Sequence, residues 1–258
     1  MKKIMALILA SVMLLVLFTG CSKKDDGEMK LVEKGKLIMS TNAAFPPYEM
    51  TTDDGGYAGI DVEIAQAIAK KLGLELVIDD MDFDAALLAV QQGKSDMVMA
   101  GVSVTNDRKK VMEFSNSYAK GIQVVIVKEG SDVTMDNLGD KMIGTQRGTT
   151  GYLYASDTPA NGGYGEDHVI AYDNGASAIK ALQNGQVDCV IIDKAPAQEF
   201  VKANPGLKLL EGTWVEEEYA IGFDKGNTGL RDKVNQALKE LTDDGTIQKI
   251  IDKYITAE

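Results

Sequence analysis

The chain has 258 residues, 27 of them Lys or Arg and 39 Asp or Glu, with a formal net charge of −12 at pH 7. Residues 21–258 contain 25 basic and 39 acidic residues and carry −14. This acidic balance argues against nucleic acid and against an electrostatically attracted membrane surface as partners. Two cysteines, Cys21 and Cys189, and one histidine, His168, offer little for a transition metal, so we expect neither a metal nor a cofactor.

The N-terminus reads as an export signal. Two lysines precede the apolar run Ile4–Phe18, which is shorter than the ~20 residues that a spanning helix needs. We therefore predict a signal peptide over residues 1–20. Its end, Leu-Phe-Thr-Gly-Cys, resembles the bacterial lipobox and implies acylation of Cys21, with residues 21–35 as a polar tether. A secretory signal with an unmodified cysteine is the alternative.

Strand-like and helix-like patterns then alternate along the chain. An apolar residue recurs every fourth position from Ile60 to Leu72, which predicts one helix that ends at Gly73. Strands are expected at residues 37–40, 74–78, 97–100 and 142–144, and further helices at 85–92 and 152–155. Such alternation is typical of βαβ units and largely parallel sheets, and so predicts an α/β fold.

An internal repeat suggests two related lobes. Residues 86–101 and 178–193 match without a gap and are identical at six of sixteen positions. Each copy reads as a helix, a glycine stop, an aspartate and a buried strand; a chance match or a common βα pattern is the alternative. In open α/β sheets, ligands bind beyond the carboxyl ends of strands. The two strand ends, Gly101 and Asp193, are therefore expected to face one cleft.

The segment after the first of these strands carries a candidate anion site. Ser103 can donate hydrogen bonds to a carboxylate, and Arg108 can bind it through two parallel hydrogen bonds. The alternative is a helix start with Thr105 as the N-cap and a solvated Arg108. The loop around Thr149 opens a short helix, whose N-terminus attracts anions, although a plain turn is also compatible.

A candidate cation site follows the second strand. Asp193 ends an apolar run, so its carboxylate needs a cationic partner such as a ligand ammonium, or else caps the next helix. Arg108, Ser103 and Thr149 opposite Asp193 would complement a zwitterionic α-amino acid. Phe45 and Phe83 are either walls of its side-chain pocket or ordinary core residues.

From about Lys36 onward the chain resembles the amino-acid-binding proteins of ABC importers. The resemblance is carried by these motifs: FPPYE at 45–49, GIDVEIA at 59–65, GVSVTNDR at 101–108, GTT at 148–150, Asp193 and EYAIG at 218–222. It implies a two-lobed α/β periplasmic-binding-protein fold of type II, with two βαβ lobes joined by two crossing strands. Lobe 1 would comprise residues 36–122 and 222–258, and lobe 2 residues 123–221.

The resemblance also assigns roles. It implies Arg108, Ser103 and Thr149 for the ligand carboxylate, and Asp193, Ser103 and the Gly101 carbonyl for the ammonium. Side-chain contacts would fall to Asn42, Phe45, Phe83 and Gln146. Asn42 stands where relatives selective for basic amino acids often carry aspartate, which weakens a lysine or arginine assignment.

Taken together, the sequence predicts an extracytoplasmic lipoprotein, monomeric and not an enzyme, that passes a polar or basic amino acid to an ABC transporter permease. Two alternatives stay open. One is the ligand-binding module of a sensor, and the other is a cyclohexadienyl-dehydratase-like enzyme on the same fold. The enzyme would use a second carboxylate or a histidine in the cleft strands, and the sequence indicates neither there.

Overall fold

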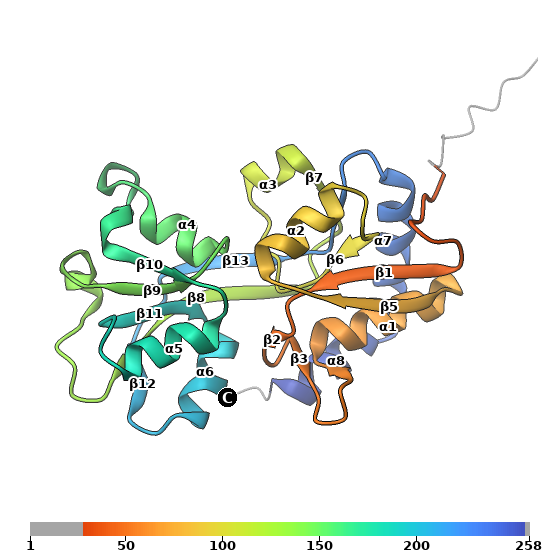
Figure 1. Cartoon of the computed structure of the whole chain (residues 1–258). Helices are drawn as coiled ribbons and strands as arrows, with labels where there is room; N and C mark the ends of the chain where they lie inside the picture. Colours follow the sequence, from red (N-terminus) through yellow and green to blue (C-terminus); the bar gives the residue numbers. More distant parts are fainter. Residues whose placement is uncertain (1–27, 256–258) are drawn as a thin grey trace, which may run out of the picture.

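The computed structural model describes residues 28–255, so Cys21 and the expected signal peptide lie outside the described residues. Two lobes lie side by side, each built on its own sheet (Figure 1). This confirms the two-lobed α/β fold, whereas the exact lobe boundaries stay a prediction. No helix in residues 28–255 is long and apolar enough to cross a membrane.

The first lobe has a five-stranded sheet covered by helices. Its strands, in spatial order, are β5 (Glu75–Asp80), β1 (Lys36–Thr41), β6 (Met97–Val98), β14 (Gly222–Asp224) and β7 (Met112–Phe114). A small sheet of β2 (Ala44–Phe45), β3 (Glu49–Thr51) and β4 (Tyr57–Ala58) adjoins it. The helices are α1 (Ile60–Leu72), α2 (Phe83–Gln91), α3 (Asn106–Val111), α7 (Thr228–Asp243) and α8 (Thr246–Tyr254).

The second lobe has a six-stranded sheet. Its strands are β10 (Val169–Tyr172), β9 (Ile143–Gln146), β11 (Cys189–Asp193), β8 (Ala119–Lys128) and β12 (Leu207–Leu209), with β13 (Val215–Tyr219) also paired to β8. Its helices are α4 (Thr150–Ser156), α5 (Gly175–Gln183) and α6 (Lys194–Ala203). Three short 3₁₀ helices span Met135–Asp140, Pro159–Asn161 and Glu166–His168.

Strands β8 and β13 form an antiparallel ribbon that connects the lobes (Figure 1). Its register pairs Gly121 with Glu217 and Gln123 with Val215. Residues opposite each other share a face, and so do residues two apart on one strand. Gln123, Glu217 and Tyr219 therefore project from the same face of this crossing ribbon. Gly121 leaves room among them, because a Cβ there would lie 2.5 Å from the Tyr219 ring.

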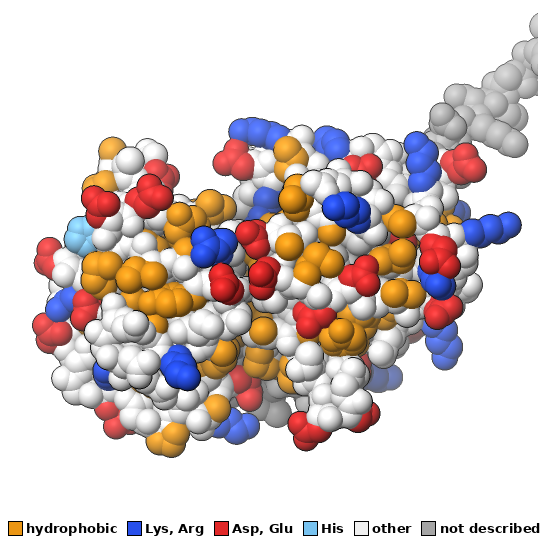
Figure 2. All heavy atoms as spheres, in the orientation of Figure 1, with side chains coloured by type: hydrophobic (Ala, Val, Ile, Leu, Met, Phe, Trp, Pro, Cys, Tyr) orange, Lys and Arg blue, Asp and Glu red, His pale blue; other side chains and the backbone are white. Residues whose placement is uncertain are grey.

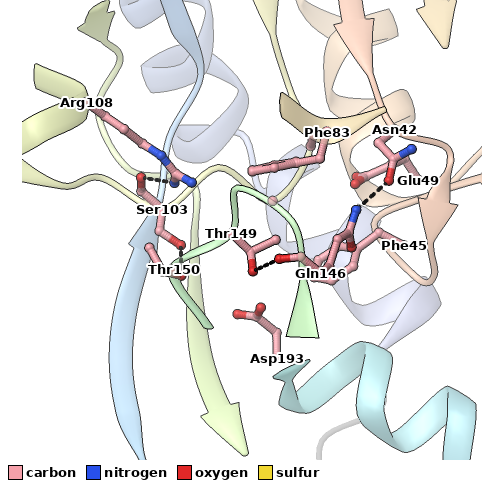
Figure 3. A pocket seen from close by; sticks show the side chains of 12 residues that line it. Asn42, Phe45, Glu49, Phe83, Ser103, Arg108, Gln146, Thr149, Thr150 and Asp193 are labelled. Carbon is pink, nitrogen blue, oxygen red and sulfur yellow. Dashed lines mark hydrogen bonds between the residues drawn. The ribbon is translucent and has the colours of Figure 1, made fainter. Parts of the chain in front are cut away.

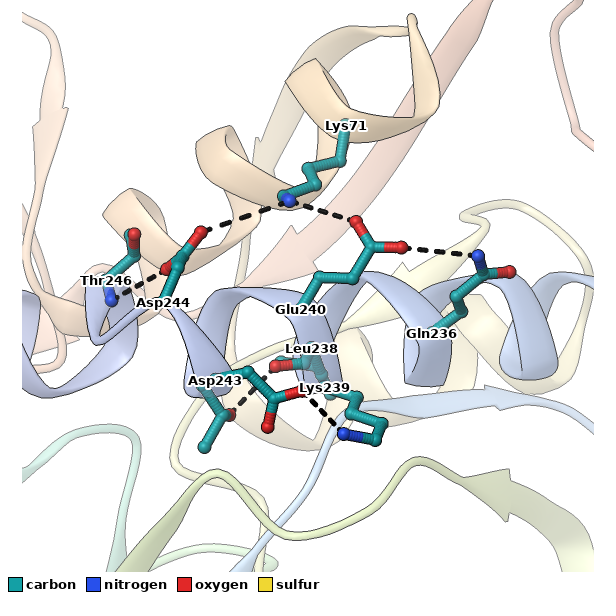
Figure 4. A network of polar contacts seen from close by, with 9 residues as sticks. Lys71, Gln236, Leu238, Lys239, Glu240, Asp243, Asp244 and Thr246 are labelled. Atoms are coloured by element: carbon teal, nitrogen blue, oxygen red, sulfur yellow. Dashed lines mark hydrogen bonds and ion pairs between the residues drawn. The ribbon is translucent and has the colours of Figure 1, made fainter.

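Helix α1 follows the predicted bounds and anchors the returning C-terminal helices. Its apolar stripe is buried from Ile60 to Ile68 and half-buried at Leu72, and Gly73 ends the helix in the left-handed region at φ 69°. Lys71 links α1 to α7 through Glu240 at 2.9 Å and to Asp244 at 4.0 Å (Figure 4). These side chains are partly exposed, so the apolar contact between α1 and α7 contributes more stability than the ion pairs.

Charged side chains of both signs are interspersed over the face shown in Figure 2.

The end of the expected tether packs against the folded protein, unlike a purely polar linker. Met29 and Leu31 pack against the core of the first lobe, and the Val32 amide donates to Asp96 at 2.7 Å. The apolar residues among the charges of this segment account for the contact.

The repeat corresponds to equivalent pieces of the two lobes. In one copy the Asp96 carboxylate accepts the amides of Val32 and Ile38, both at 2.7 Å; in the other, Asp188 accepts the Met142 amide at 2.8 Å. Each aspartate stands just before a strand, and through these hydrogen bonds it links that strand to the start of the neighbouring one. The difference is burial, since Asp96 is 2% exposed whereas Asp188 is exposed.

Replacing Asp96 with Ala should lower the free energy of unfolding by about 2–4 kcal/mol, because two amides lose a charged acceptor and at least one is buried. Asp188→Ala is the matched control and should cost about 1 kcal/mol, since its partner amide can turn to water. Urea denaturation of both variants measures this difference. Equal losses would contradict the role given to burial.

Candidate functional site

A small, largely enclosed cavity lies between the lobes (Figure 3). Its lining is polar and almost fully buried, and includes all nine residues expected from the sequence and the resemblance. The lining residues are Asn42, Phe45, Glu49, Phe83, Ala100, Gly101, Ser103, Arg108, Gln146, Thr149, Thr150 and Asp193. In Figure 3 the Arg108 guanidinium stands at one end and the Asn42–Gln146 pair at the other.

Arg108 is a buried cation held by backbone carbonyls. Thr105 Oγ1 accepts its amide at 3.1 Å, so the N-cap of the alternative interpretation is confirmed, but the residue is only 7% exposed and the solvated Arg108 of that alternative is wrong. Nη1 donates to the Ser103 carbonyl at 2.8 Å, and Nη2 crosses to the Gly148 carbonyl of the other lobe at 3.0 Å. Its Cζ lies 5.4 Å from the centroid of the Phe83 ring.

No carboxylate in residues 28–255 forms an ion pair with this guanidinium. Burial lowers the pKa of Arg108, and the charge of nearby Glu217 opposes that shift. An arginine side chain keeps its charge under all ordinary conditions. A buried cation with only carbonyl partners is electrostatically incomplete, so the cavity end at Arg108 favours an anion.

Asp193 supplies the negative charge at the end of β11. Its Oδ1 accepts from the Tyr219 hydroxyl, and its Oδ2 accepts from Gln123 Nε2 at 2.8 Å. The side chain makes no capping bond to α6, so it faces the crossing ribbon rather than the helix. Burial raises the pKa of Asp193 to about 7, against the two hydrogen bonds, which lower it.

An amide pair closes the far end of the cavity. Gln146 Nε2 donates to Asn42 Oδ1 across the lobes at 2.9 Å, while Asn42 Nδ2 donates to the Met81 carbonyl at 2.9 Å. Phe45 stacks on Tyr48, with ring centroids 5.9 Å apart. Both predicted aromatics are thus core residues and cavity walls at once.

A second carboxylate, Glu49, also lines the cavity, which corrects the expectation that the cleft holds only one. It is fully buried, and burial together with the Asp61 charge raises its pKa well above the usual range. Neither Glu49 oxygen accepts a hydrogen bond from a described donor, and nor does Asp61 Oδ1. The hydrogen bond between these two side chains raises the pKa of Glu49 and lowers that of Asp61, so it requires a proton on Glu49 and leaves the other Glu49 oxygen free.

The hydroxyl groups of Thr149 and the adjacent Thr150 have different hydrogen-bond partners. The Thr149 hydroxyl donates to the Gln146 carbonyl at 2.8 Å and accepts the Tyr152 amide at 3.3 Å, so it stabilises the turn into α4. The Thr150 hydroxyl instead donates to Glu217 Oε2 at 2.8 Å. Thr150, Gln123 and Glu217 could not be chosen from the sequence. Gln123 and Glu217 converge through the register of β8 against β13, which period-two alternation along these strands only hints at, and Thr150 joins them from the start of α4.

Two α/β lobes closed over a small, buried polar cavity define a solute-binding protein. Residues 37–257 match the bacterial extracellular solute-binding proteins, family 3, and the chain belongs to that family. The expected extracytoplasmic class is therefore confirmed.

Similar proteins agree on the class and differ in ligand. The chain is 31% identical to the L-cystine-binding protein TcyJ of Escherichia coli strain K12, over 97% of this chain and 95% of that protein. It is 32% identical to the arginine-binding extracellular protein ArtP of Bacillus subtilis strain 168, over the full length of both. Among solved structures, the arginine-, lysine-, histidine-binding protein ArtJ of Geobacillus stearothermophilus has a TM-score of 0.80 at 33% identity, covering 86% of this chain and 96% of that chain.

An ancestral arginine-binding protein bound to glutamine also superposes with a TM-score of 0.80 at 38% identity, over 87% of this chain and 100% of that one. All these relatives are named as binding proteins.

The buried carboxyl groups predict how stability depends on pH in the ligand-free protein. Burial raises the pKa of Asp193 from 3.8 to about 7, so between these values the folded state binds more protons than the unfolded state. The stabilising contribution of Asp193 is therefore present at low pH and is lost as pH rises toward 7. Urea denaturation at about pH 5 and about pH 7.5 should show that Asp193→Asn gains stability relative to wild type at the higher pH.

The exposed Asp82→Asn is the control and should track wild type at both pH values. A difference between wild type and Asp193→Asn that is the same at both pH values would contradict the raised pKa.

Proposed function

We propose that this protein captures a free α-amino acid outside the cytoplasm and delivers it to an ABC transporter permease. The observation that carries the proposal is the buried Arg108 guanidinium, which faces a cavity and, within residues 28–255, donates hydrogen bonds only to carbonyls. The ligand α-carboxylate would supply its missing anion through a bidentate pair. Asp193 would accept the α-ammonium together with Ser103 and the Gly101 carbonyl.

The far end of the cavity favours a polar or basic ligand side chain. Asn42 and Gln146 present amide groups there, and the free Glu49 oxygen offers an acceptor for an N–H donor. Phe45 and Phe83 would flank the aliphatic part of the side chain. Relatives named for arginine, histidine and cystine binding support this class of ligand. A thermal-shift screen of the amino acids, with ornithine and cystine added, tests the assignment.

Binding without chemistry fits the site better than catalysis. Asp193, the candidate acid or base, is already held by Tyr219 and Gln123, an arrangement suited to fixing a cation, and Glu49, the second carboxyl group in the cavity, is hydrogen-bonded to Asp61. We propose that the protein works as a monomer and uses no cofactor. Its transport role is supported by relatives named as transporter binding proteins.

Arg108→Ala should weaken binding of the best amino acid from the screen by about 30- to 5,000-fold. Removing one partner of a buried charged pair typically costs about 2–5 kcal/mol, and each ~1.4 kcal/mol is a factor of ten. Arg108→Lys should not restore affinity, because an ammonium cannot form the two parallel bonds. Isothermal titration calorimetry measures both variants.

Arg147→Ala is the matched control for Arg108. Arg147 lies in the loop beside the cavity but is half exposed and contacts only Asp173, at 3.6 Å. Its loss should change affinity by less than about 1 kcal/mol. Near-wild-type binding by Arg108→Ala would remove the main reason for an α-amino acid ligand.

We also propose that Cys21 is acylated and anchors the protein to the outer face of the cell membrane. The lipobox-like ending of the signal supports this, and several acyl chains, at roughly 0.8 kcal/mol per buried CH₂, give a stable anchor. Cys21→Ser should release the protein from the membrane fraction. Mass spectrometry of the membrane-extracted protein should find a lipid-modified Cys21 as its first residue; any other N-terminus would contradict the anchor.

A further inference from the structure

The crossing ribbon contributes a carboxylate, Glu217, that has no part in the ligand contacts proposed above. Glu217 is half buried in the middle of β13, on the same face as Gln123 and Tyr219. Its neighbours in the chain, Glu216 and Glu218, point to the opposite face and are exposed. Of these three consecutive glutamates, only Glu217 reaches the residues that line the cavity.

One oxygen of Glu217 gathers donors from three parts of the fold. Oε2 accepts from Ser103 Oγ of the first lobe at 3.0 Å, from Thr150 Oγ1 at the start of α4 at 2.8 Å, and from Gln123 Nε2 of β8 at 3.0 Å. Ser103 and Thr150 lie next to each other on the cavity wall, with their hydroxyl oxygens 3.4 Å apart (Figure 3).

These bonds fix the direction of both hydroxyl groups. A serine or threonine hydroxyl has a single proton to donate and two lone pairs to accept with. When both protons point to Glu217, Ser103 Oγ and Thr150 Oγ1 can only accept hydrogen bonds from a ligand. Of the two contacts expected for Ser103, this direction favours the one with the ligand ammonium over a hydroxyl hydrogen bond to the ligand carboxylate.

The same carboxylate also strengthens the negative end of the site. Gln123 Nε2 donates to Asp193 Oδ2 at 2.8 Å as well as to Glu217, so one amide joins the two carboxylates. The charge of Glu217 contributes to the raised pKa of Asp193. Asp193 and the two oriented hydroxyls therefore form a group of acceptors suited to a primary ammonium, which has three donors and no acceptor.

We infer that Glu217 is a positioning residue for ligand specificity: it turns Ser103 and Thr150 into acceptors and so makes the site require the α-ammonium of its ligand. The ligand carboxylate is left to Arg108 and to backbone amides. The inference rests on the proposed function, because it takes the ligand to be an α-amino acid. Its measurable consequence is discrimination between an amino acid and the same molecule without its ammonium.

The probes are L-arginine with δ-guanidinovalerate and L-glutamine with glutaramate, each pair differing by the α-ammonium. Wild type should bind at least one of the amino acids and reject its des-amino analogue. In Glu217→Gln the uncharged amide no longer holds both hydroxyl protons, so the amino acid should bind about 10- to 100-fold more weakly. The des-amino analogue should bind as well as before or better, because the hydroxyls can now donate to its carboxylate.

The decisive quantity is the dissociation constant of the des-amino analogue divided by that of the amino acid. A positioning role lowers this ratio in the variant, whereas a purely structural role would weaken binding of both probes alike and leave the ratio unchanged. Glu216→Gln and Glu218→Gln remove the same charge from the opposite face and should leave the ratio unchanged. Glu217→Asp should keep part of the discrimination, since it retains the charge on a shorter side chain. Thr150→Val provides an independent test, because it removes one oriented acceptor without altering Glu217, and should also lower the ratio.

An unchanged ratio in Glu217→Gln and in Thr150→Val, with amino acid binding intact, would overturn the role of Glu217 and leave the proposed function standing. Failure of wild type to bind these two amino acids and every other polar or basic amino acid of the thermal-shift screen would instead overturn the proposed ligand class, and this inference with it.

Discussion

The arrangement of the cleft depends on one buried cation. A guanidinium removed from water needs compensating contacts, and Arg108 takes them from a carbonyl of each lobe, Ser103 on its own side and Gly148 on the other. Gly148 permits this approach: its φ is +74°, and a Cβ there would meet Asp84 Cβ at 3.2 Å. Arg108 therefore bonds to both lobes in this closed arrangement, and its side chain also lines the cavity.

The cleft also contains buried acids that form no ion pair with Arg108, and each of them is stabilised by a different interaction. Asp193 keeps hydrogen bonds from Tyr219 and Gln123. Asp61 accepts the Gly101 amide at 3.0 Å and the Tyr118 hydroxyl at 2.8 Å, and burial still raises its pKa to about 6. A proton on Glu49 removes one negative charge from this pair. The cavity can then hold several carboxyl groups without the repulsion that full ionisation would cause.

The sequence was sufficient for local features and for the residues that follow strand ends. The four-residue spacing gave the bounds of α1, and the repeat located Gly101 and Asp193 on opposite walls. It was insufficient wherever a role depends on which side chains face each other. Glu49 ends the FPPYE motif, but the motif alone does not show that its carboxyl group lines the cavity. Glu217 is one of three consecutive glutamates, distinguished only by the register of β13 against β8.

The crossing ribbon both joins the lobes and forms part of the site. Gln123, Glu217 and Tyr219 all stand on its inner face, and each bonds to a cavity residue of one lobe or the other. A bend of the ribbon would change the angle between the lobes and also the direction of these three side chains. Ligand contacts made through them would therefore differ between open and closed states, and such a difference is what allows a ligand to shift a conformational equilibrium.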